Sequence, residues 1–259
     1  HQPLLDKMNE LSYTHSYLFK YRECRFITFV SVQGISKYCN SMNQFVMQGS
    51  FFAHRALTRD VRLLNAIAQR VDQLKQDQLD AVVKWYEFFW NMMEAHHAAE
   101  DDLLFRAVEE RLDAPSEVIE VMEVEHNRLQ FLIDEIKRLL GELQRKGVDA
   151  LLSKELQFNA SELLKVFMGH IAKEEAYMFE KMTAHFSPDE QRRIEEEVKR
   201  KAPVRYLSYM IPWLRDALSA EENKLLDESL PWTARLMNKW FWKNRYDRLM
   251  RPLKGMANL

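Results

Sequence analysis

Two pairs of residues with the same spacing constrain this chain more than any other feature: His96 with Glu100, and His170 with Glu174. Each pair joins a histidine and a glutamate four positions apart, inside a stretch with helical periodicity. Residues four apart lie on one face of an α-helix, so each pair directs an imidazole nitrogen and a carboxylate toward the same point. Iron, manganese and zinc accept nitrogen and carboxylate oxygen as ligands. The chain is therefore expected to form helices that face one another around a metal centre.

Apolar residues recur at spacings of three and four through the middle of the chain, which predicts four long helices. Only six glycines occur among 259 residues, and this scarcity favours long helices joined by short turns. Helix ends are expected before Pro115, near Gly147, and before Ser187 and Pro188. The four helices are expected at about 43–74, 78–112, 116–144 and 153–184. Short loops make antiparallel neighbours, so the predicted fold is all-α, an up-down-up-down four-helix bundle.

The bundle is expected to span residues 45–185, between an N-terminal segment (1–44) and a C-terminal helical extension (186–259). The N-terminal segment is expected to pack on the bundle, and its residues 27–32 suit either a strand or a buried helix. The extension is expected to contain shorter helices broken at Pro203, Pro212 and Pro231.

Residues 240–248, within the extension, mix aromatic and basic side chains. The favoured interpretation is an amphipathic helix whose aromatic rings cover the outside of the bundle while its charges stay in water. The alternatives are a lid over the mouth of the bundle and a binding surface for an acidic ligand.

The composition argues against several classes of protein. The formal net charge of −2 predicts no nucleic-acid partner. Cys24 and Cys39 are too few for a disulfide framework and match no metal-binding spacing, which favours a reducing compartment. No apolar run reaches the ~18 residues expected of a membrane span, and no signal peptide is visible at His1. The expected location is therefore cytoplasmic.

Each of the four expected helices carries a histidine at a depth that places it in a common layer. His54 and His126 lie early in their helices, whereas His96 and His170 lie beyond the middle of theirs. Because neighbouring helices run in opposite directions, an early position on one is level with a late position on the next. Burying such a layer without a metal would cost much desolvation energy. The predicted metal ligands are His54, His96, Glu100, His126, His170 and Glu174.

Two other spacings compete with this set. His97 and Asp101 are also four residues apart, but they point about 100° away from the first pair. His97 is therefore expected to face a neighbouring helix or a residue that supports a ligand. Glu123 and His126 have the spacing of ferritin-like di-iron sites, which need that spacing on two helices; it occurs here on one.

Four segments carry a resemblance to a known family: AHRAL from Ala53, HHAAEDDLLF from His96, EH from Glu125 and HIAKEEAYMF from His170. They resemble the motifs of the hemerythrin-like, HHE cation-binding family over about residues 45–185. The resemblance implies a four-helix bundle in which the six predicted ligands hold two iron ions, with manganese or zinc as substitutes. Arg106 stands where the family often has proline, a departure expected to matter little.

The number of histidines affects the expected function. Respiratory oxygen carriers of this family use five histidines and two carboxylates, whereas four histidines are counted here, because Met122 and Gln130 flank His126 at the four-residue spacing. One nitrogen fewer would leave an open position at an iron, which favours chemistry over carriage. The expected function is a non-haem di-iron oxidoreductase that activates or reduces O₂ or peroxide, with room for a small organic substrate. The alternative is a protein that senses or stores O₂, NO or iron without turnover.

Overall fold

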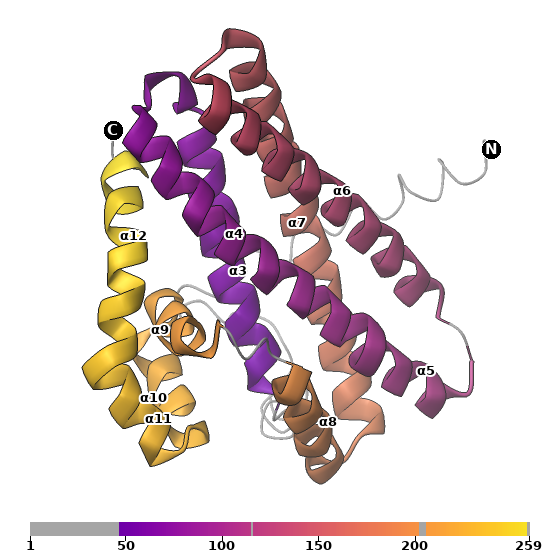
Figure 1. Cartoon of the computed structure of the whole chain (residues 1–259). Helices are drawn as coiled ribbons and strands as arrows, with labels where there is room; N and C mark the ends of the chain where they lie inside the picture. The colour runs from indigo at the N-terminus through magenta and orange to yellow at the C-terminus, as the bar shows by residue number, and fades with distance from the viewer. Residues whose placement is uncertain (1–46, 115, 202–205, 258–259) are drawn as a thin grey trace, which may run out of the picture. The chain divides into compact units, whose positions relative to one another are not determined.

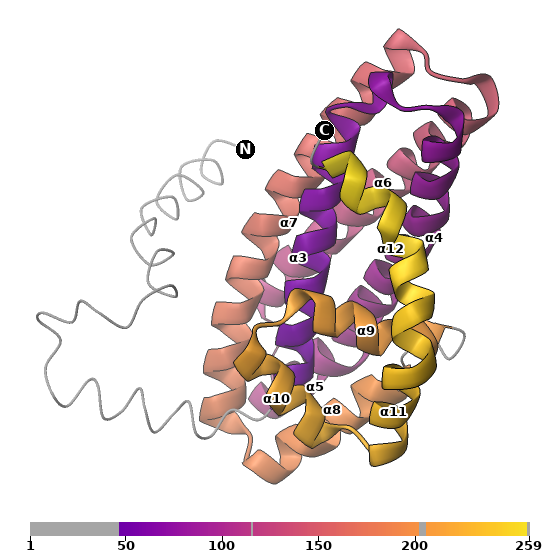
Figure 2. The same ribbon diagram turned by 90° about the vertical axis from the view of Figure 1, so that its left-hand side faces the viewer.

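A four-helix bundle forms the centre of the chain in the computed structural model, which describes residues 47–114, 116–201 and 206–257. All of these described residues belong to one compact unit. The four bundle helices are α3 (Gln48–Ala68), α4 (Gln76–Ala99), α6 (Glu117–Lys146) and α7 (Ala150–His185). Helix α3 packs against α4 and α7, and α6 packs against the same two helices, so the four close into a ring (Figures 1 and 2). The described residues are helices and loops, which confirms the predicted all-α bundle.

Most of the predicted helix ends are close to the observed ones. Ser116 caps α6, with its hydroxyl accepting from the Ile119 amide, and Gly147 ends α6 with a φ of 85°. The start of the fourth helix was predicted three residues too late. Asp149 caps α7 by accepting from the amides of residues 151 and 152, so Ser153 lies inside the helix. A short 3₁₀ helix, η2 (Val71–Gln73), connects α3 to α4.

Helix α4 continues into a π-helical segment, η3 (Glu100–Phe105), and then into α5 (Arg106–Leu112). The segment begins at a predicted metal ligand, Glu100. π-Helical turns are rare and often occur at functional sites. The predicted second helix, 78–112, therefore corresponds to three consecutive helical segments, α4, η3 and α5. The π-helical segment lies in the region of the candidate site.

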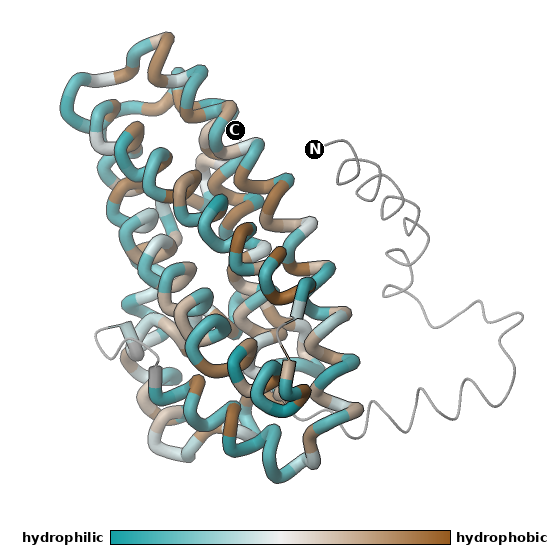
Figure 3. Tube along the Cα trace, turned by 90° about the vertical axis from the view of Figure 1, so that its right-hand side faces the viewer, coloured by the Kyte–Doolittle hydropathy of each residue, from teal (hydrophilic) through white to brown (hydrophobic). Residues whose placement is uncertain are grey.

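The core of the bundle divides into two apolar clusters with a polar layer between them. Buried residues such as Leu57, Trp85 and Phe89 form the larger cluster, and Leu104 and Met178 belong to the smaller one. All predicted ligands except His170 fall between the residues of the two clusters along the sequence, and His170 lies at the edge of the larger cluster, next to Ile171. Figure 3 shows apolar and polar residues alternating along each helix, as expected for helices with one buried face. Packing of these apolar faces fixes the depth at which the histidines meet.

The C-terminal extension consists of short helices that pack against the bundle. They are α8 (Pro188–Lys201), α9 (Leu207–Ala217), α10 (Ala220–Ser229), α11 (Trp232–Met237), the π-helical η5 (Asn238–Trp242) and α12 (Lys243–Ala257). Helix α8 begins at Pro188 with a Ser187–Glu190 capping pair, as predicted. Pro231 separates α10 from α11, but the break expected at Pro212 is wrong, because Pro212 lies inside α9. Proline has no amide hydrogen, so the Ser208 carbonyl, four residues earlier in the first turn of α9, receives no hydrogen bond from residue 212.

The aromatic side chains of residues 240–248 cover the bundle only in part, whereas the favoured interpretation predicted that they all would. Trp240 and Phe241 are 60% and 64% exposed, and Trp232 is 68% exposed. Tyr246 of α12, by contrast, is buried in the larger core cluster, and its hydroxyl donates to Asp216 of α9. The buried residue of the π-helical η5 is Asn238, so the rings of Trp240 and Phe241 lie on its exposed side.

A buried carboxylate anchors the extension to the bundle. Asp60 of α3 is fully buried and accepts hydrogen bonds from Trp213 Nε1 at 2.7 Å and Arg59 Nε at 2.9 Å. Arg59 also donates to the Trp213 carbonyl and to Asp216. Burial raises the pKa of Asp60, and the neighbouring Arg59 opposes that rise. The carboxylate thus connects α3 with α9 through a closed set of polar contacts.

Two remaining sequence predictions concern other parts of the chain. The segment 1–44, with its ambiguous stretch 27–32, and Pro203 lie outside the residues that the structure describes. Among the described helices, none has a stretch both long enough and apolar enough to cross a membrane.

Candidate metal centre

The polar layer of the bundle holds seven side chains in two neighbouring groups. One group contains His54, His96, Glu100 and Glu174, and the other contains His97, His126 and His170. Within each group the potential ligand atoms lie within 4.8 Å of one another. All six residues predicted from the sequence are brought together here, from all four bundle helices, together with a seventh, His97.

His97, expected to face a neighbouring helix or a residue that supports a ligand, faces His126 of the neighbouring helix α6 and lies within the layer. Its side chain is buried, its ring stacks on His126 with the ring centroids 4.2 Å apart, and it faces His170. Neighbouring residues of a helix point about 100° apart, so His96 and His97 do not face the same position. They can still belong to two adjacent groups. His96 turns toward one group and His97 toward the other. The sequence signal was the His-His pair itself.

The two carboxylates of the first group also reach the histidines of the second group. Glu100 Oε1 is 3.0 Å from His96 Nε2 and 3.3 Å from His54 Nε2, and its other oxygen is 3.7 Å from His126 Nε2. Glu174 Oε2 is 3.5 Å from His54 Nε2 and 3.4 Å from His170 Nε2. Each glutamate therefore approaches histidines of both groups.

The outer nitrogens of three histidines are held by carboxylates that sequence reasoning did not assign to these histidines. Nδ1 of His54 lies 3.1 Å from Glu175, and Nδ1 of His126 lies 2.8 Å from Asp101. Such a partner fixes the ring so that Nε2 faces inward, an arrangement typical of metal-binding histidines. Asp101 and Glu175 each directly follow a predicted ligand in the sequence, and this adjacency was the available signal.

His170 has the third carboxylate partner, Glu125, whose Oε2 lies 3.2 Å from His170 Nδ1. Glu125 also pairs with Lys173. His170 Nε2 lies 3.0 Å from His126 Nε2. Two imidazole nitrogens at that distance converge on one region of space, as ligands of a shared cation would.

Proton occupancy in the layer follows from burial and the two central carboxylates. Burial disfavours a charged imidazole, but Glu174, Glu100 and Glu175 outweigh it and raise the pKa of His54 to about 10. Glu125 and Glu174 likewise outweigh burial and raise the pKa of His170 to about 9. Without a cation, these two histidines neutralise the layer by carrying protons. A metal must displace those protons, because a histidine ligand has to be neutral.

The pKa values of two other histidines in the layer are lowered, and those of the two glutamates shift in opposite directions. Burial and the neighbouring imidazoles lower the pKa values of His96 and His97 well below the usual value. Burial and the Glu174 charge raise the pKa of Glu100, while His54 and His170 lower that of Glu174 although burial opposes this. His96 and His97 are thus already neutral donors.

Several atoms of the layer are buried without a hydrogen-bond partner among the described residues. They include His97 Nε2, Glu100 Oε2 and Glu174 Oε2. A buried polar atom without a partner is costly. A cation between the groups would satisfy these atoms, and mixed imidazole and carboxylate donors suit iron, manganese or zinc. The residues therefore fit a metal centre.

A small cavity lies next to one side of the layer. It has a volume of about 20 Å³ and is lined by His54 and Glu174 together with apolar side chains that include Phe51, Leu104 and Met178. A cavity of this size holds about one water-sized molecule. A small molecule would fit beside His54, whereas an organic substrate would not fit without movement of the lining side chains.

The carboxylates behind the histidines lead to a first prediction. Replacing Asp101 or Glu175 by Ala is expected to lower iron affinity by about 10- to 100-fold, because the histidine loses its orienting partner. The measurement is a titration against a competing chelator. The matched control is Glu110→Ala, since Glu110 is exposed and lies in the same part of the bundle as Asp101. Unchanged affinity in both variants would show that these contacts do not orient ligands.

Fold and layer together define a class: a helical bundle with a buried histidine and carboxylate cluster suited to cations. The Hemerythrin HHE cation binding domain, as a family model, matches residues 52–182. The chain belongs to this family, as the resemblance implied, and the matched region contains all seven side chains of the layer.

Curated relatives include plant proteins. The chain is 25% identical over 179 residues to zinc finger protein BRUTUS of Arabidopsis thaliana. The aligned region covers 69% of this chain and 14% of that protein. A BRUTUS-like zinc finger protein of the same plant is 24% identical over 172 residues, covering 66% of this chain and 14% of the relative. The matched part of the chain thus spans about one seventh of the length of these relatives. No solved structure matches the chain.

Proposed function

We propose that this chain is a dinuclear iron-binding module, with one iron ion in each group of the polar layer. The observation that supports it is the set of five imidazoles in two groups with two carboxylates that approach both. Glu100 and Glu174 would contribute to holding both ions, since each approaches histidines of both groups. Bound iron would supply redox and Lewis-acid chemistry to the layer. Manganese and zinc would be tolerated by the same donors.

The fifth histidine changes the balance between turnover and binding. The oxidoreductase hypothesis rested on a count of four histidines and hence on an open position at one iron. With His97 as a fifth donor, the histidine count no longer implies an open position at one iron, and it no longer favours turnover. The cavity beside His54 is also too small for an organic substrate. We therefore propose reversible binding, of iron itself and of a small ligand such as O₂, peroxide or NO, as the function.

The residues of the chain have definable tasks in this function. His54 and His170 release protons when a cation enters and take them up when it leaves, which makes iron uptake weaker at low pH. Phe51, Leu104 and Met178 exclude bulk water from the layer, because they cover the side of His54 that faces the small cavity. Glu175, which is partly exposed, keeps the His54 ring in place.

Anaerobic loading with Fe(II) tests the proposal. We expect elemental analysis to give about two iron ions per chain for the natural sequence, and about one for His97→Ala. The matched control is His185→Ala, which removes an exposed histidine and should keep both ions. Retention of two iron ions by both His97→Ala and His96→Ala would contradict the dinuclear assignment.

The loaded protein is then exposed to O₂ and to peroxide and followed optically. Reversible binding predicts a spectral change that disappears when the gas is removed, and no sustained consumption of peroxide. Catalytic consumption of O₂ or peroxide over many cycles would overturn reversible binding and return the oxidoreductase hypothesis.

A further inference from the structure

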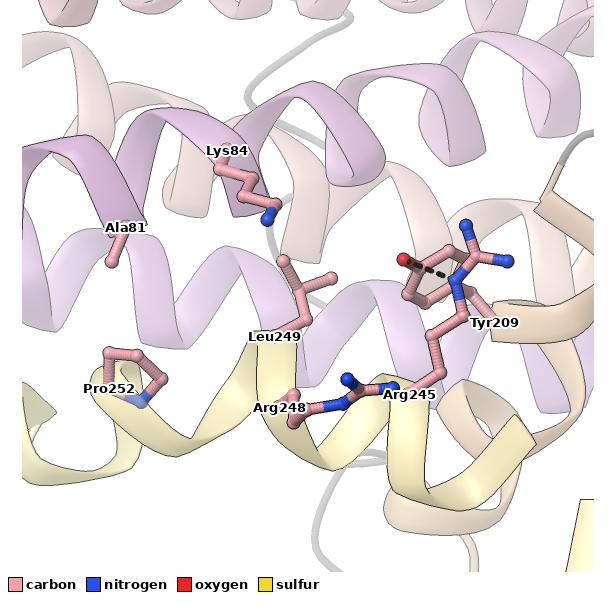
Figure 4. A pocket seen from close by; sticks show the side chains of 7 residues that line it. All are labelled: Ala81, Lys84, Tyr209, Arg245, Arg248, Leu249 and Pro252. Atoms are coloured by element: carbon pink, nitrogen blue, oxygen red, sulfur yellow. Dashed lines mark hydrogen bonds between the residues drawn. The ribbon is translucent and has the colours of Figure 1, made fainter. Parts of the chain in front are cut away.

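A second cavity, away from the polar layer, lies between α4, α9 and α12. It has a volume of about 370 Å³, within the range of small-molecule sites. Lys84 of α4, Arg245 and Arg248 of α12 and Tyr209 of α9 line it (Figure 4). Lys84 lies twelve residues before His96, which corresponds to about 18 Å along a helix, so this cavity is separate from the metal centre.

The charge of the cavity has one sign. Three cationic side chains line it, and no carboxylate is among its described lining residues. The lining residues that α12 contributes lie within residues 238–257. This segment carries six Lys or Arg and one Asp, in a chain of net charge −2. A cleft lined by charges of one sign concentrates ions of the opposite sign.

The cations of the cavity differ from their neighbours in having no carboxylate partner. Lys243 pairs with Asp247 and Lys254 pairs with Asp216, both on or near the same helix. In contrast, no ion pair to a carboxylate is formed by Lys84, Arg245 or Arg248 within the part of the chain that the structure describes. Among the described residues, nearby carboxylates such as Asp247 and Asp216 thus pair with other cations and leave these three without an ion pair.

The arginines are also held in place. Arg245 Nε donates to Tyr209 Oη at 2.8 Å, its guanidinium lies 4.6 Å from the centre of the Tyr209 ring, and a second nitrogen donates to Ser208. Arg248 Nε donates to the Asn244 carbonyl, which leaves the forked end of its guanidinium for other acceptors. Figure 4 shows Lys84 reaching from α4 toward α12, with Leu249 below it and Arg245 against Tyr209. Guanidinium groups fixed in this way match phosphate oxygens better than mobile lysines do.

We propose that this cavity binds a free small molecule that carries a phosphate group with at least two negative charges. Three unpaired cations call for a multivalent anion, and the planar donor forks of two arginines favour phosphate. Leu249 and Pro252 form an apolar wall that would contact the organic part of such a ligand. The proposal is independent of the metal centre and stands whether or not iron binds there.

Calorimetric titration with inorganic pyrophosphate tests it. We expect the full chain to bind pyrophosphate, with an affinity that falls as salt is added. The double variant Lys84→Gln/Arg248→Gln should bind roughly 100-fold more weakly, since each lost charged hydrogen bond contributes about tenfold or more. Arg245 is left unchanged because its contacts with Tyr209 and Ser208 also support the fold.

The matched control is Lys224→Gln/Arg251→Gln, which removes the same charge from exposed positions that do not line the cavity. It should bind pyrophosphate as the natural sequence does, and both double variants should keep their helical circular dichroism and metal content. Equal binding by the two double variants, or no binding by the natural sequence, would overturn the proposal.

Two further probes test the class and the source of the ligand. Citrate has a similar charge but no phosphate, so binding as tight as that of pyrophosphate would show a site for polyanions in general and overturn the phosphate class. Vesicles of phosphatidylcholine and phosphatidylserine test lipid headgroups. Binding to these vesicles that depends on Lys84 and Arg248, without binding to pyrophosphate, would overturn a free small molecule as the ligand.

Discussion

Replacing Glu100 by Gln is expected to lower iron affinity by more than about 100-fold, because even residues behind the ligands of a metal change affinity by 10- to 100-fold. Glu100 is fully buried, and its oxygens lie between 3.0 and 3.7 Å from the nitrogens of three histidines. Gln keeps the shape of the side chain but removes a negative charge from beside the proposed ions. Glu174→Gln should have a similar effect, since Glu174 also approaches histidines of both groups.

A chelator competition measures this loss, with elemental analysis as the independent readout. The control is Glu94→Gln, because Glu94 is exposed on the same helix, α4, and has the same change of charge. Circular dichroism should show that all variants keep the bundle. A Glu100→Gln protein that still holds two iron ions under competition would rule out a contribution of Glu100 to holding both ions.

The layer could be predicted from the sequence because two periodic signals coincide in it. Apolar spacing gave the four helices, and the depths of His54, His96, His126 and His170 on them gave a common level. Helical geometry then requires these side chains to meet, whatever the details of packing. The donor set indicated a metal, the family resemblance implied two iron ions, and the structure brings the same six residues together.

The part of the layer that was not predicted lies where the angle on one helix was used in place of the arrangement of four. His97 was excluded by its angle on the helix, but the centre of the bundle is wide enough to hold two groups side by side. The π-helical η3, which begins at Glu100, also cannot be read from periodicity, because its local winding breaks the 3.6-residue repeat.

Contacts between distant segments could not be predicted at all. His170 is held by Glu125, which precedes His126 in the sequence but contacts a histidine on another helix. The second cavity joins Lys84 to residues of α12 that follow it by more than 160 positions. No local pattern encodes such pairs, since they depend on how the extension packs against the bundle.

The packing of that extension depends on Asp60, and replacing Asp60 by Ala is expected to destabilise the protein by about 3 kcal/mol. Removing one partner of a buried ion pair typically costs about 3–5 kcal/mol, because the other charge is left without compensation. Asp60 is fully buried between α3 and α9, and its loss leaves Trp213 Nε1 without an acceptor. The lower end of the range is expected because Arg59 keeps its contact with Asp216.

Urea unfolding followed by tryptophan fluorescence measures the change, since Trp213 itself reports on the contact. Asp72→Ala is the control: Asp72 is exposed in η2, so its loss should change stability by no more than about 0.5 kcal/mol. Asp60→Asn separates charge from hydrogen bonding, because its amide oxygen can still accept from Trp213 while its neutral side chain no longer balances Arg59. An intermediate loss for Asp60→Asn is therefore expected. A cost below about 1 kcal/mol for Asp60→Ala would mean that apolar contacts of α9 and α12, rather than this carboxylate, hold the extension against the bundle.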